Sequence, residues 1–314
     1  MKYYAGVDLG GTNMKIGILN ENGEILIKKT IKTLSNKGVE ITLKRIWETI
    51  EKLMDQKKIK KEGMTGIGIG IPGPVIDRAV VVFLANFNWG CNINISKIMK
   101  KISGIPTKLE NDANMIAIGE NKFGAGKGST NSITISLGTG IGGGIIVNSR
   151  LISGVNGASG EIGHMKLVKN GKLCGCGQRG CFEAYASATG IIKEAKLRLA
   201  VDKNNLLYSS LDDDIEKLEV KNIFDCAKLG DKFSIGIVDY VGEYLAMGIG
   251  NLLNIMNPEI IILSGGVSLA GDILLETIES KLKEYAIPIT IKDLKIKLGE
   301  LGDEAGIKGS IGLF

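Results

Sequence analysis

The stretch YYAGVDLGGTNMKIGILN, residues 3–20, decides the fold of this chain. Residues 3–8 and 14–20 are typical of two β-strands, and the turn LGGTN joins them. A third strand is expected in EILIKKTIKT, after the turn signal NENGE. Glycine at a strand end lets backbone N–H groups approach a ligand closely. The stretch therefore predicts three consecutive strands with a turn that is open to a ligand.

The order of elements predicts an α/β protein built from two similar units. After the first three strands, apolar residues at helical spacing predict a helix over 37–57, with Ile41, Leu43, Ile46, Ile50 and Leu53 on one face. Strands at 66–72 and 106–111 and a helix at 113–123 follow. A second set then begins, with expected strands at 131–137, 144–149, 150–154, 259–264 and 294–299, and helices at 234–255, 270–284 and the C-terminus. Two hairpin-plus-crossover units predict two related α/β domains facing a cleft.

Composition excludes several classes of protein. The 314 residues are 44% apolar and 23% charged, with a formal net charge of +5, which indicates an ordinary globular protein of two domains. Its N-terminus has no signal-peptide pattern, and no apolar run approaches the ~18 residues of a membrane span. Five cysteines, of which three are clustered, do not indicate a disulfide framework. We expect a cytoplasmic protein that binds neither nucleic acid nor membrane.

The chain holds 44 glycines, many of them in short glycine-rich stretches between apolar runs, which are called knots below. Gly138, Gly140 and Gly143 match the dinucleotide-binding spacing, but β-branched, turn-rich residues follow where that motif needs a helix. GAGKGST is not a P-loop, because Gly128 stands where that motif needs Ser or Thr. What fits is a strand–turn–strand phosphate clamp that occurs twice. A plain tight hairpin is the alternative for each single knot.

The first clamp is DLGGTN, in which Gly10 and Gly11 expose amides and Thr12 adds a hydroxyl donor. Asp8 ends the strand, where its carboxylate could hold a water of a magnesium ion. In LGTGIGGG, Thr139 with Gly138 and Gly140 repeats the arrangement. A third knot, LSGGV, contains Gly265 and Gly266.

One further stretch, HMKLVKNGKLCGCGQRGC at residues 164–181, contains the sole histidine and three of the five cysteines. Thiolates and imidazole suit Zn²⁺, and four protein ligands are typical of a structural zinc site. The alternative, three cysteines acting as buried apolar residues, conflicts with a stretch so rich in Gly, Lys, Asn and Gln. The pattern predicts a zinc-pinned loop with His164, Cys174, Cys176 and Cys181 as ligands.

Over nearly its whole length the chain resembles the ROK sugar kinases of the actin/hexokinase superfamily. The motifs occur in that family's order, and GEIGH followed by C-x-C-G-x-x-G-C-x-E is the most specific of them. They are DLGGTN, GIPGPV, LENDAN, LGTGIGGG, GEIGHM, CGCGQRGCFE and LSGGV. The resemblance implies two ribonuclease-H-like domains facing an interdomain cleft. We expect a small domain of residues 1–115 plus 300–314 and a larger domain, 116–299, that carries the zinc loop.

The resemblance also implies a catalytic base and a set of binding residues. Asp112 in LENDAN matches the family's base, although it could instead only cap the following helix. The implied sugar-binding residues are Gly73, Asn86, Asn111, Asp112, Glu161, His164 and Glu183. The implied residues for ATP with Mg²⁺ are Asp8, Gly10, Gly11, Thr12, Asn13, Gly138, Thr139, Gly140, Gly265 and Gly266. One ring nitrogen of His164 would bind zinc and the other a sugar hydroxyl. Asn88 stands where the common family form has glycine.

The function this implies is ATP-dependent phosphorylation of a hexose, with D-glucose to glucose 6-phosphate as first choice. N-acetylmannosamine or another hexose is the alternative substrate. The family also contains sugar-responsive repressors, which carry a helix-turn-helix ahead of the first phosphate turn, whereas DLGGTN here begins at Asp8. A zinc module for nucleic acid is disfavoured by an aromatic content of 5%. Relatives of the family lead us to expect a homo-oligomer, a dimer or tetramer.

Overall fold

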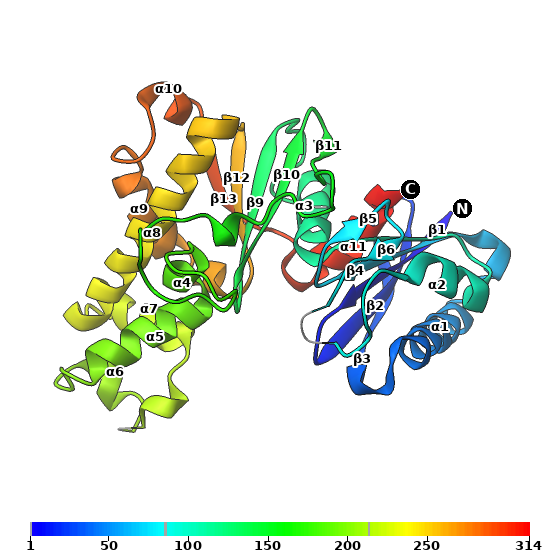
Figure 1. Ribbon diagram of the computed structural model, residues 1–314, viewed down its shortest axis with the longest axis horizontal. Helices are drawn as coiled ribbons and strands as arrows, with labels where there is room; N and C mark the ends of the chain where they lie inside the picture. The colour runs from blue at the N-terminus through cyan, green and yellow to red at the C-terminus, as the bar shows by residue number, and fades with distance from the viewer. Residues whose placement is uncertain (1, 85–86, 213) are drawn as a thin grey trace. The chain divides into compact units, whose positions relative to one another are not determined.

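The computed structural model describes residues 2–84, 87–212 and 214–314 (Figure 1). The chain folds into two compact units. Unit 1 comprises residues 1–134, 144–160 and 300–314, and unit 2 comprises 135–143 and 161–299. The sequence placed a domain boundary after residue 115. That boundary stays a prediction.

The first sheet has the strand order β3-β2-β1-β4-β8. β1 pairs antiparallel with β2, and β2 with β3, whereas β1–β4 and β4–β8 are parallel. The predicted three-strand start of the chain is therefore confirmed. A small sheet, β5-β6-β7, adds three short strands. The strands are β1 (Tyr3–Leu9), β2 (Asn13–Asn20), β3 (Ile25–Lys32), β4 (Met64–Ile71), β5 (Val75–Ile76), β6 (Val80–Val81), β7 (Ile93–Asn94) and β8 (Thr107–Asn111).

The second sheet has the order β11-β10-β9-β12-β13, and the division between the units passes through β9 and β10. Each sheet has the same order: the first three strands of its set lie side by side, and the two later strands continue the sheet beside the first strand. The predicted repeat is therefore confirmed. A strand follows the Gly138 knot, as expected, while the strand predicted at 150–154 is only two residues long. The strands are β9 (Ser132–Leu137), β10 (Ile141–Val147), β11 (Arg150–Leu151), β12 (Ile260–Ser264) and β13 (Lys295–Leu298).

Within the described residues, all five predicted helices are present, as α1, α3, α8, α9 and α11, and six others, mostly short, join them. Those of unit 1 are α1 (Val39–Gln56), α2 (Ile95–Ser103), α3 (Asp112–Phe123) and α11 (Ala305–Gly309). Those of unit 2 are α4 (Glu183–Ala186), α5 (Ala188–Leu199), α6 (Leu206–Ser209), α7 (Val220–Lys228), α8 (Lys232–Met256), α9 (Asp272–Leu282) and α10 (Pro288–Ile291). Figure 1 shows α1 and α2 side by side, and they pack on each other.

The apolar face predicted for α1 is correct except at Ile41. Leu43, Ile46, Ile50 and Leu53 lie in the core of unit 1, whereas Ile41 is 46% exposed. Two residues advance an α-helix by about 200°, so Ile41 cannot share the face of Leu43.

The backbone of α11 lies very close to the backbones of β1 and α3. A Cβ added at Gly119 of α3 would lie 2.2 Å from the carbonyl oxygen of Ala305, and one at Gly6 of β1 would lie 2.4 Å from that of Ile307. A Cβ at Gly309 would lie 2.0 Å from the carbonyl oxygen of Met115. Glycine at these points therefore allows α11 to pack closely on β1 and α3, which both lead into candidate site residues.

Candidate functional site

The β1–β2 turn presents backbone donors at its tip. The Gly10 amide donates to the Asn13 carbonyl at 3.1 Å, and the Thr33 hydroxyl donates to the Gly10 carbonyl at 2.6 Å, which fixes the base of the turn. Gly11, Thr12 and Asn13 are exposed. The structure thus places Gly10, Gly11, Thr12 and Asn13, all predicted to bind the nucleotide, in one turn.

Asp8 lies beside this turn at the start of α11. A Cβ at Gly306 would lie 3.5 Å from the Asp8 carboxyl carbon. Burial raises the pKa of Asp8, although the nearby Lys15 ammonium acts in the opposite direction. Lys15 is itself paired with Asp303 at 2.8 Å. A buried carboxylate in such a setting gains from a cation partner, which is consistent with the predicted magnesium role.

The end of β8 and the start of α3 bring three predicted residues together. Asn111 caps the helix, because its Oδ1 accepts from the amides of Ala113 at 2.9 Å and Asn114 at 3.2 Å. Its Nδ2 donates to the carbonyl of Gly73 at 3.4 Å. Asp112, the first residue of α3, also accepts from the Ala113 amide at 2.9 Å. Since Asn111 caps the helix, α3 does not depend on the Asp112 carboxylate for its N-terminus.

Glu110 supports this corner from inside the core. It is 2% exposed, and its Oε1 accepts from the Asn111 amide and from the Asn114 side chain at 3.0 Å. Glu110 was not predicted as a site residue, because nothing in LENDAN distinguishes a buried glutamate from an exposed one. Asn86, predicted to bind sugar, lies outside the described residues.

Burial raises the pKa of Glu110 above its ordinary value of 4.5, against the effect of its hydrogen bonds. A carboxyl whose pKa is raised in the fold stabilises the fold when protonated, and that contribution is lost as pH rises through the raised pKa. We therefore expect Glu110→Gln to unfold at a higher temperature than the wild type near neutral pH. The gap should narrow as pH falls toward 4.5. Thermal melts of both proteins across pH test this, and a gap that is constant with pH would contradict it.

In unit 2, the β9–β10 turn is held by its neighbours. The Gly138 amide donates to the Gly140 carbonyl at 3.0 Å, and the Ala188 amide donates to the Gly138 carbonyl at 2.9 Å. The Glu183 carboxylate lies beside Gly140 of this turn: a Cβ added to Gly140 would be 2.7 Å from Glu183 Oε2. Thr139, between the two glycines, is exposed. The turn predicted as the second clamp is therefore formed, with a predicted sugar residue beside it, and its binding of phosphate stays a prediction.

LSGGV contains the end of β12, and its first glycine, Gly265, packs on β9. Gly265 has φ of +89°, and a Cβ added there would lie 2.6 Å from the Leu137 carbonyl oxygen. A Cβ on Gly266 would meet nothing within 4 Å. The fold thus requires glycine at position 265, whereas the space around Gly266 would admit a side chain.

Gly265→Ala should destabilise unit 2 by about 2 kcal/mol, because an L side chain is strained at this φ and also meets the β9 backbone. Gly266→Ala is the matched control and should leave the melting temperature within about a degree of the wild type. Differential scanning fluorimetry of the two variants checks this. Equal melting temperatures for both would show that the close approach to Leu137 is unimportant.

A pocket of 560 Å³ in unit 2 is lined by the β9–β10 turn, residues 172–175 of the cysteine-rich loop and the start of α5. It adds residues that the sequence analysis missed, among them Ser187, Thr189 and Lys193. Ser187 caps α5 by accepting from the Gly190 amide at 3.1 Å. The signal was present in the Ser–Ala–Thr–Gly run at 187–190, which is typical of a helix start. The size lies within the usual range of ligand pockets.

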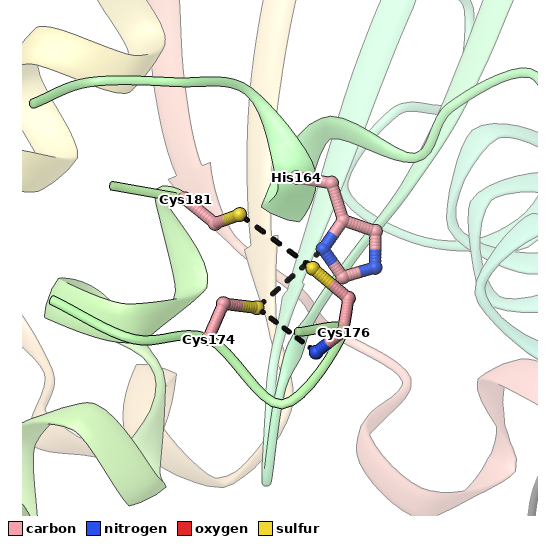
Figure 2. Close-up of side chains that lie close together, drawn as sticks. All are labelled: His164, Cys174, Cys176 and Cys181. Carbon is pink, nitrogen blue, oxygen red and sulfur yellow. Dashed lines mark hydrogen bonds between the residues drawn. The ribbon is translucent and has the colours of Figure 1, made fainter. Parts of the chain in front are cut away.

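The four predicted metal ligands converge (Figure 2). One donor atom from each of His164, Cys174, Cys176 and Cys181 lies within 4.8 Å of the other three. The Sγ atoms of Cys176 and Cys181 are 3.8 Å apart, and His164 Nδ1 is 3.8 Å from Cys174 Sγ. A tetrahedral ion with 2.3 Å bonds to sulfur has sulfur–sulfur edges of about 3.8 Å. The donor set and its spacing therefore fit a tetrahedral metal ion.

The three cysteines differ in burial and in their hydrogen bonds. Cys174 and Cys181 are buried, whereas Cys176 is exposed. Burial and a hydrogen bond to Glu183 raise the pKa of the Cys174 thiol, and the Gln178 amide lowers that of Cys176. The Cys174 amide donates to the Gln178 carbonyl at 2.8 Å, which closes the tight loop between the cysteines.

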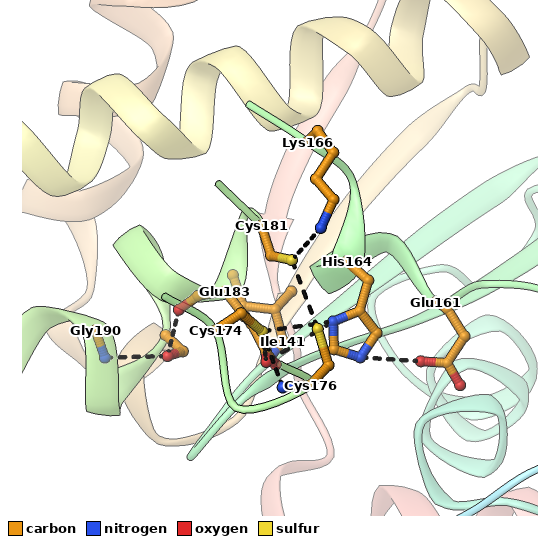
Figure 3. Close-up of polar contacts among 10 residues, drawn as sticks. Ile141, Glu161, His164, Lys166, Cys174, Cys176, Cys181, Glu183 and Gly190 are labelled. Atoms are coloured by element: carbon orange, nitrogen blue, oxygen red, sulfur yellow. Dashed lines mark hydrogen bonds and ion pairs between the residues drawn. The ribbon is translucent and has the colours of Figure 1, made fainter. Parts of the chain in front are cut away.

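The ring of His164 has two distinct sides (Figure 3). Nδ1 faces the cysteines and lies 3.8 Å from Glu183 Oε1, while Nε2 is 3.9 Å from Glu161 Oε2. Glu183 Oε1 also accepts from the Cys174 thiol at 2.9 Å. The predicted trio Glu161, His164 and Glu183 is thus brought together beside the predicted metal ligands.

In the described part of the chain, every helix is too short or too polar to traverse a lipid bilayer.

Two sheets of the same strand order, each with a glycine-rich turn after its first strand, define an α/β protein of the actin/hexokinase type. The chain belongs to the ROK family, whose profile matches residues 4–314.

Glucokinases are among its relatives. That of Thermotoga maritima is 39% identical over 97% of this chain and 95% of its own, and that of Halalkalibacterium halodurans is 37% identical over 98% and 93%. A Streptomyces griseus ROK family glucokinase, solved in complex with glucose and AMPPNP, superposes with a TM-score of 0.82 at 32% identity, over 99% of this chain and 98% of that one. The xylose repressor of Bacillus subtilis is 33% identical over 98% of this chain but 75% of the repressor.

Proposed function

We propose that this protein transfers the γ-phosphoryl group of ATP to the 6-hydroxyl of D-glucose, giving glucose 6-phosphate and ADP. The observation that carries the proposal is Asp112 at the N-terminus of α3, where Asn111 already caps the helix and the carboxylate can act on a substrate. The glucokinase relatives, similar over nearly the full length of both chains, favour glucose over N-acetylmannosamine. The xylose repressor is less similar, and a quarter of its length is unmatched.

In the proposed reaction, Asp112 orients the 6-hydroxyl and accepts its proton as the bond from that oxygen to the γ-phosphorus forms. The bond from the γ-phosphorus to the bridging oxygen breaks, and ADP leaves. Such a transition state is loose, so positioning and charge neutralisation dominate the rate enhancement. The positive end of the α3 dipole favours the ionised form of Asp112 at the outset.

The nucleotide phosphates would receive hydrogen bonds from backbone amides. In unit 1 the donors would be the Gly11 amide and the Thr12 hydroxyl, because the Gly10 amide is already bonded to Asn13. In unit 2 they would be the amides around Thr139. Mg²⁺, when bound with ATP, neutralises charge on the phosphoryl oxygens. Asp8 would hold the ion through a water molecule, and the positive charge would offset the cost of burying that carboxylate in its ionised form. The 560 Å³ pocket beside Thr139 and Gly140 is the proposed place for the rest of the nucleotide.

The sugar would be recognised by groups that both donate and accept hydrogen bonds. In unit 1 these are Asn111 and Asp112, with the Gly73 backbone beside them. In unit 2 they are Glu161, His164 and Glu183, of which His164 would offer Nε2 because Nδ1 faces the cysteines.

We further propose that the Cys₃His cluster holds zinc. Three thiolates and one imidazole at tetrahedral spacing are the donors that structural zinc prefers. Zinc, when bound here, closes its shell with four protein ligands and so supplies a cross-link rather than an activated water. That cross-link would fix the orientation of His164 and the start of α4, where Glu183 lies.

A coupled assay of ADP release over a panel of hexoses tests the function. With ATP and Mg²⁺, glucose should give a kcat/KM at least about tenfold above mannose, galactose, fructose and N-acetylmannosamine. Phosphorus NMR of the product should show a 6-phosphate. A higher kcat/KM for N-acetylmannosamine would overturn the substrate, and no sugar-dependent ADP release with any hexose would overturn the kinase.

A further inference from the structure

One contact of the cysteine cluster is not accounted for by the four ligands. Lys166 Nζ donates to Cys181 Sγ at 2.8 Å (Figure 3). Cys181 is fully buried, and no other lysine or arginine among the described residues donates to any of the four donor atoms. In the sequence alone, this lysine is only one of several polar residues of the loop.

The backbone fixes this contact. Lys166 and Cys181 face each other in an isolated antiparallel bridge. Hydrogen bonds on both sides support the bridge: the Phe182 amide donates to the Met165 carbonyl, and the Leu167 amide to the Gly180 carbonyl, both at 2.8 Å. Side chains directly opposite each other across such a bridge lie on the same face. The register of the chain therefore delivers the ammonium to the sulfur.

The charge of the site explains why a cation is useful there. Three thiolates and a divalent ion leave a net charge of −1, part of it on the buried sulfurs of Cys174 and Cys181. The carboxylate of Glu183 lies 2.9 Å from Cys174 Sγ, and that of Glu161 lies 3.9 Å from His164 Nε2. Among the described residues, Lys166 is thus the one cationic group that contacts the cluster, and the other charged groups beside it are carboxylates.

We propose that Lys166 is a positioning residue of the metal site, whose ammonium stabilises the Cys181 thiolate by a charge-assisted hydrogen bond and thereby slows metal loss. This inference rests on the proposed zinc site and assigns it one partner outside the four ligands. Hydrogen-bonding partners of metal ligands commonly change metal affinity by about 10- to 100-fold. Because Lys166 is exposed on its outer side, the effect belongs at the lower end of that range.

The test compares zinc release from purified full-length wild type, Lys166→Met, Lys166→Arg and Lys169→Met. Lys169 is the matched control, since it is exposed in the same loop and no contact with its side chain is found among the described residues. A chromophoric chelator in excess reports the rate of release. We expect release about tenfold faster from Lys166→Met, within about threefold of wild type from Lys166→Arg, and unchanged from Lys169→Met. Circular dichroism checks that each variant is folded.

A second readout isolates the hydrogen bond from any general loosening of the loop. In Co²⁺-substituted protein, removal of a donor from a thiolate should shift the sulfur-to-metal charge-transfer band to lower energy in Lys166→Met but not in Lys169→Met. Equal release rates and identical bands for these two variants would overturn the role of Lys166. Wild-type protein that binds neither Zn²⁺ nor Co²⁺ would instead overturn the proposed metal site, and that result is obtained before any variant is made.

Discussion

Asp112→Ala should lower kcat for glucose phosphorylation by about 10³-fold while leaving KM for ATP within about twofold of wild type. The carboxylate is the proposed acceptor of the 6-hydroxyl proton, so its loss acts on the chemical step. The helix should survive, because Asn111 Oδ1 still accepts from the amides of Ala113 and Asn114. A coupled assay gives kcat and both KM values, and a melting curve shows whether the variant is folded.

Asp272→Ala is the matched control for this experiment. Asp272 is the first residue of α9, as Asp112 is of α3, so both substitutions remove an acidic side chain from the first turn of a helix. If Asp112 only supports its helix, the two variants should lose similar stability and neither should lose turnover. A folded Asp112→Ala protein with more than about a tenth of wild-type kcat would refute the assignment of the base.

Cys176→Ser should abolish stable metal binding and lower kcat/KM for glucose by about a hundredfold. Without the cross-link, the loop that carries His164 and leads to Glu183 is no longer fixed, and misplacement of a binding group by about 1 Å can cost that factor. Cys176 suits the test because its side chain is exposed, so the substitution leaves the core of unit 2 intact. Metal analysis should give about one zinc per wild-type chain and a small fraction of that for the variant.

Cys91→Ser controls for the loss of an exposed thiol as such, because Cys91 is also exposed but lies far along the chain from the cluster. It should retain full zinc and full activity.

The KM for ATP should rise less than the KM for glucose in Cys176→Ser, although residues 172–175 line the unit 2 pocket and some effect on ATP is expected. Wild-type protein with less than about half an equivalent of zinc would refute the metal site.

Local patterns in the sequence were sufficient to predict most of the framework. The first three strands, α3 and its cap at Asn111, and the convergence of His164 with three cysteines all follow from short-range spacing. These features depend on residues close together in the chain, where turn and helix geometry decide what can meet.

Other features could not be predicted because they depend on contacts between distant segments. The approach of Gly265 to Leu137 and the burial of Glu110 exist only after the strands have paired and packed. The contact of Lys166 with Cys181 needs a backbone bridge across fifteen residues, for which the loop sequence carries no strand signal. Helices α4 to α7 were missed since their apolar residues gave no pattern that the sequence analysis used.

The close packing of α11 against glycines of β1 and α3 has a consequence for biosynthesis. Unit 1 contains both the earliest strands and residues 300–314, so ribosomal synthesis delivers its last piece after the 139 residues from 161 to 299 have already emerged. The β1–β4 layer must therefore wait, with one face uncovered, while unit 2 has all its residues available. Contacts so distant in sequence slow folding and lengthen the exposure of apolar surface. The half of the protein that is translated first thus receives its last helix only at the end of synthesis.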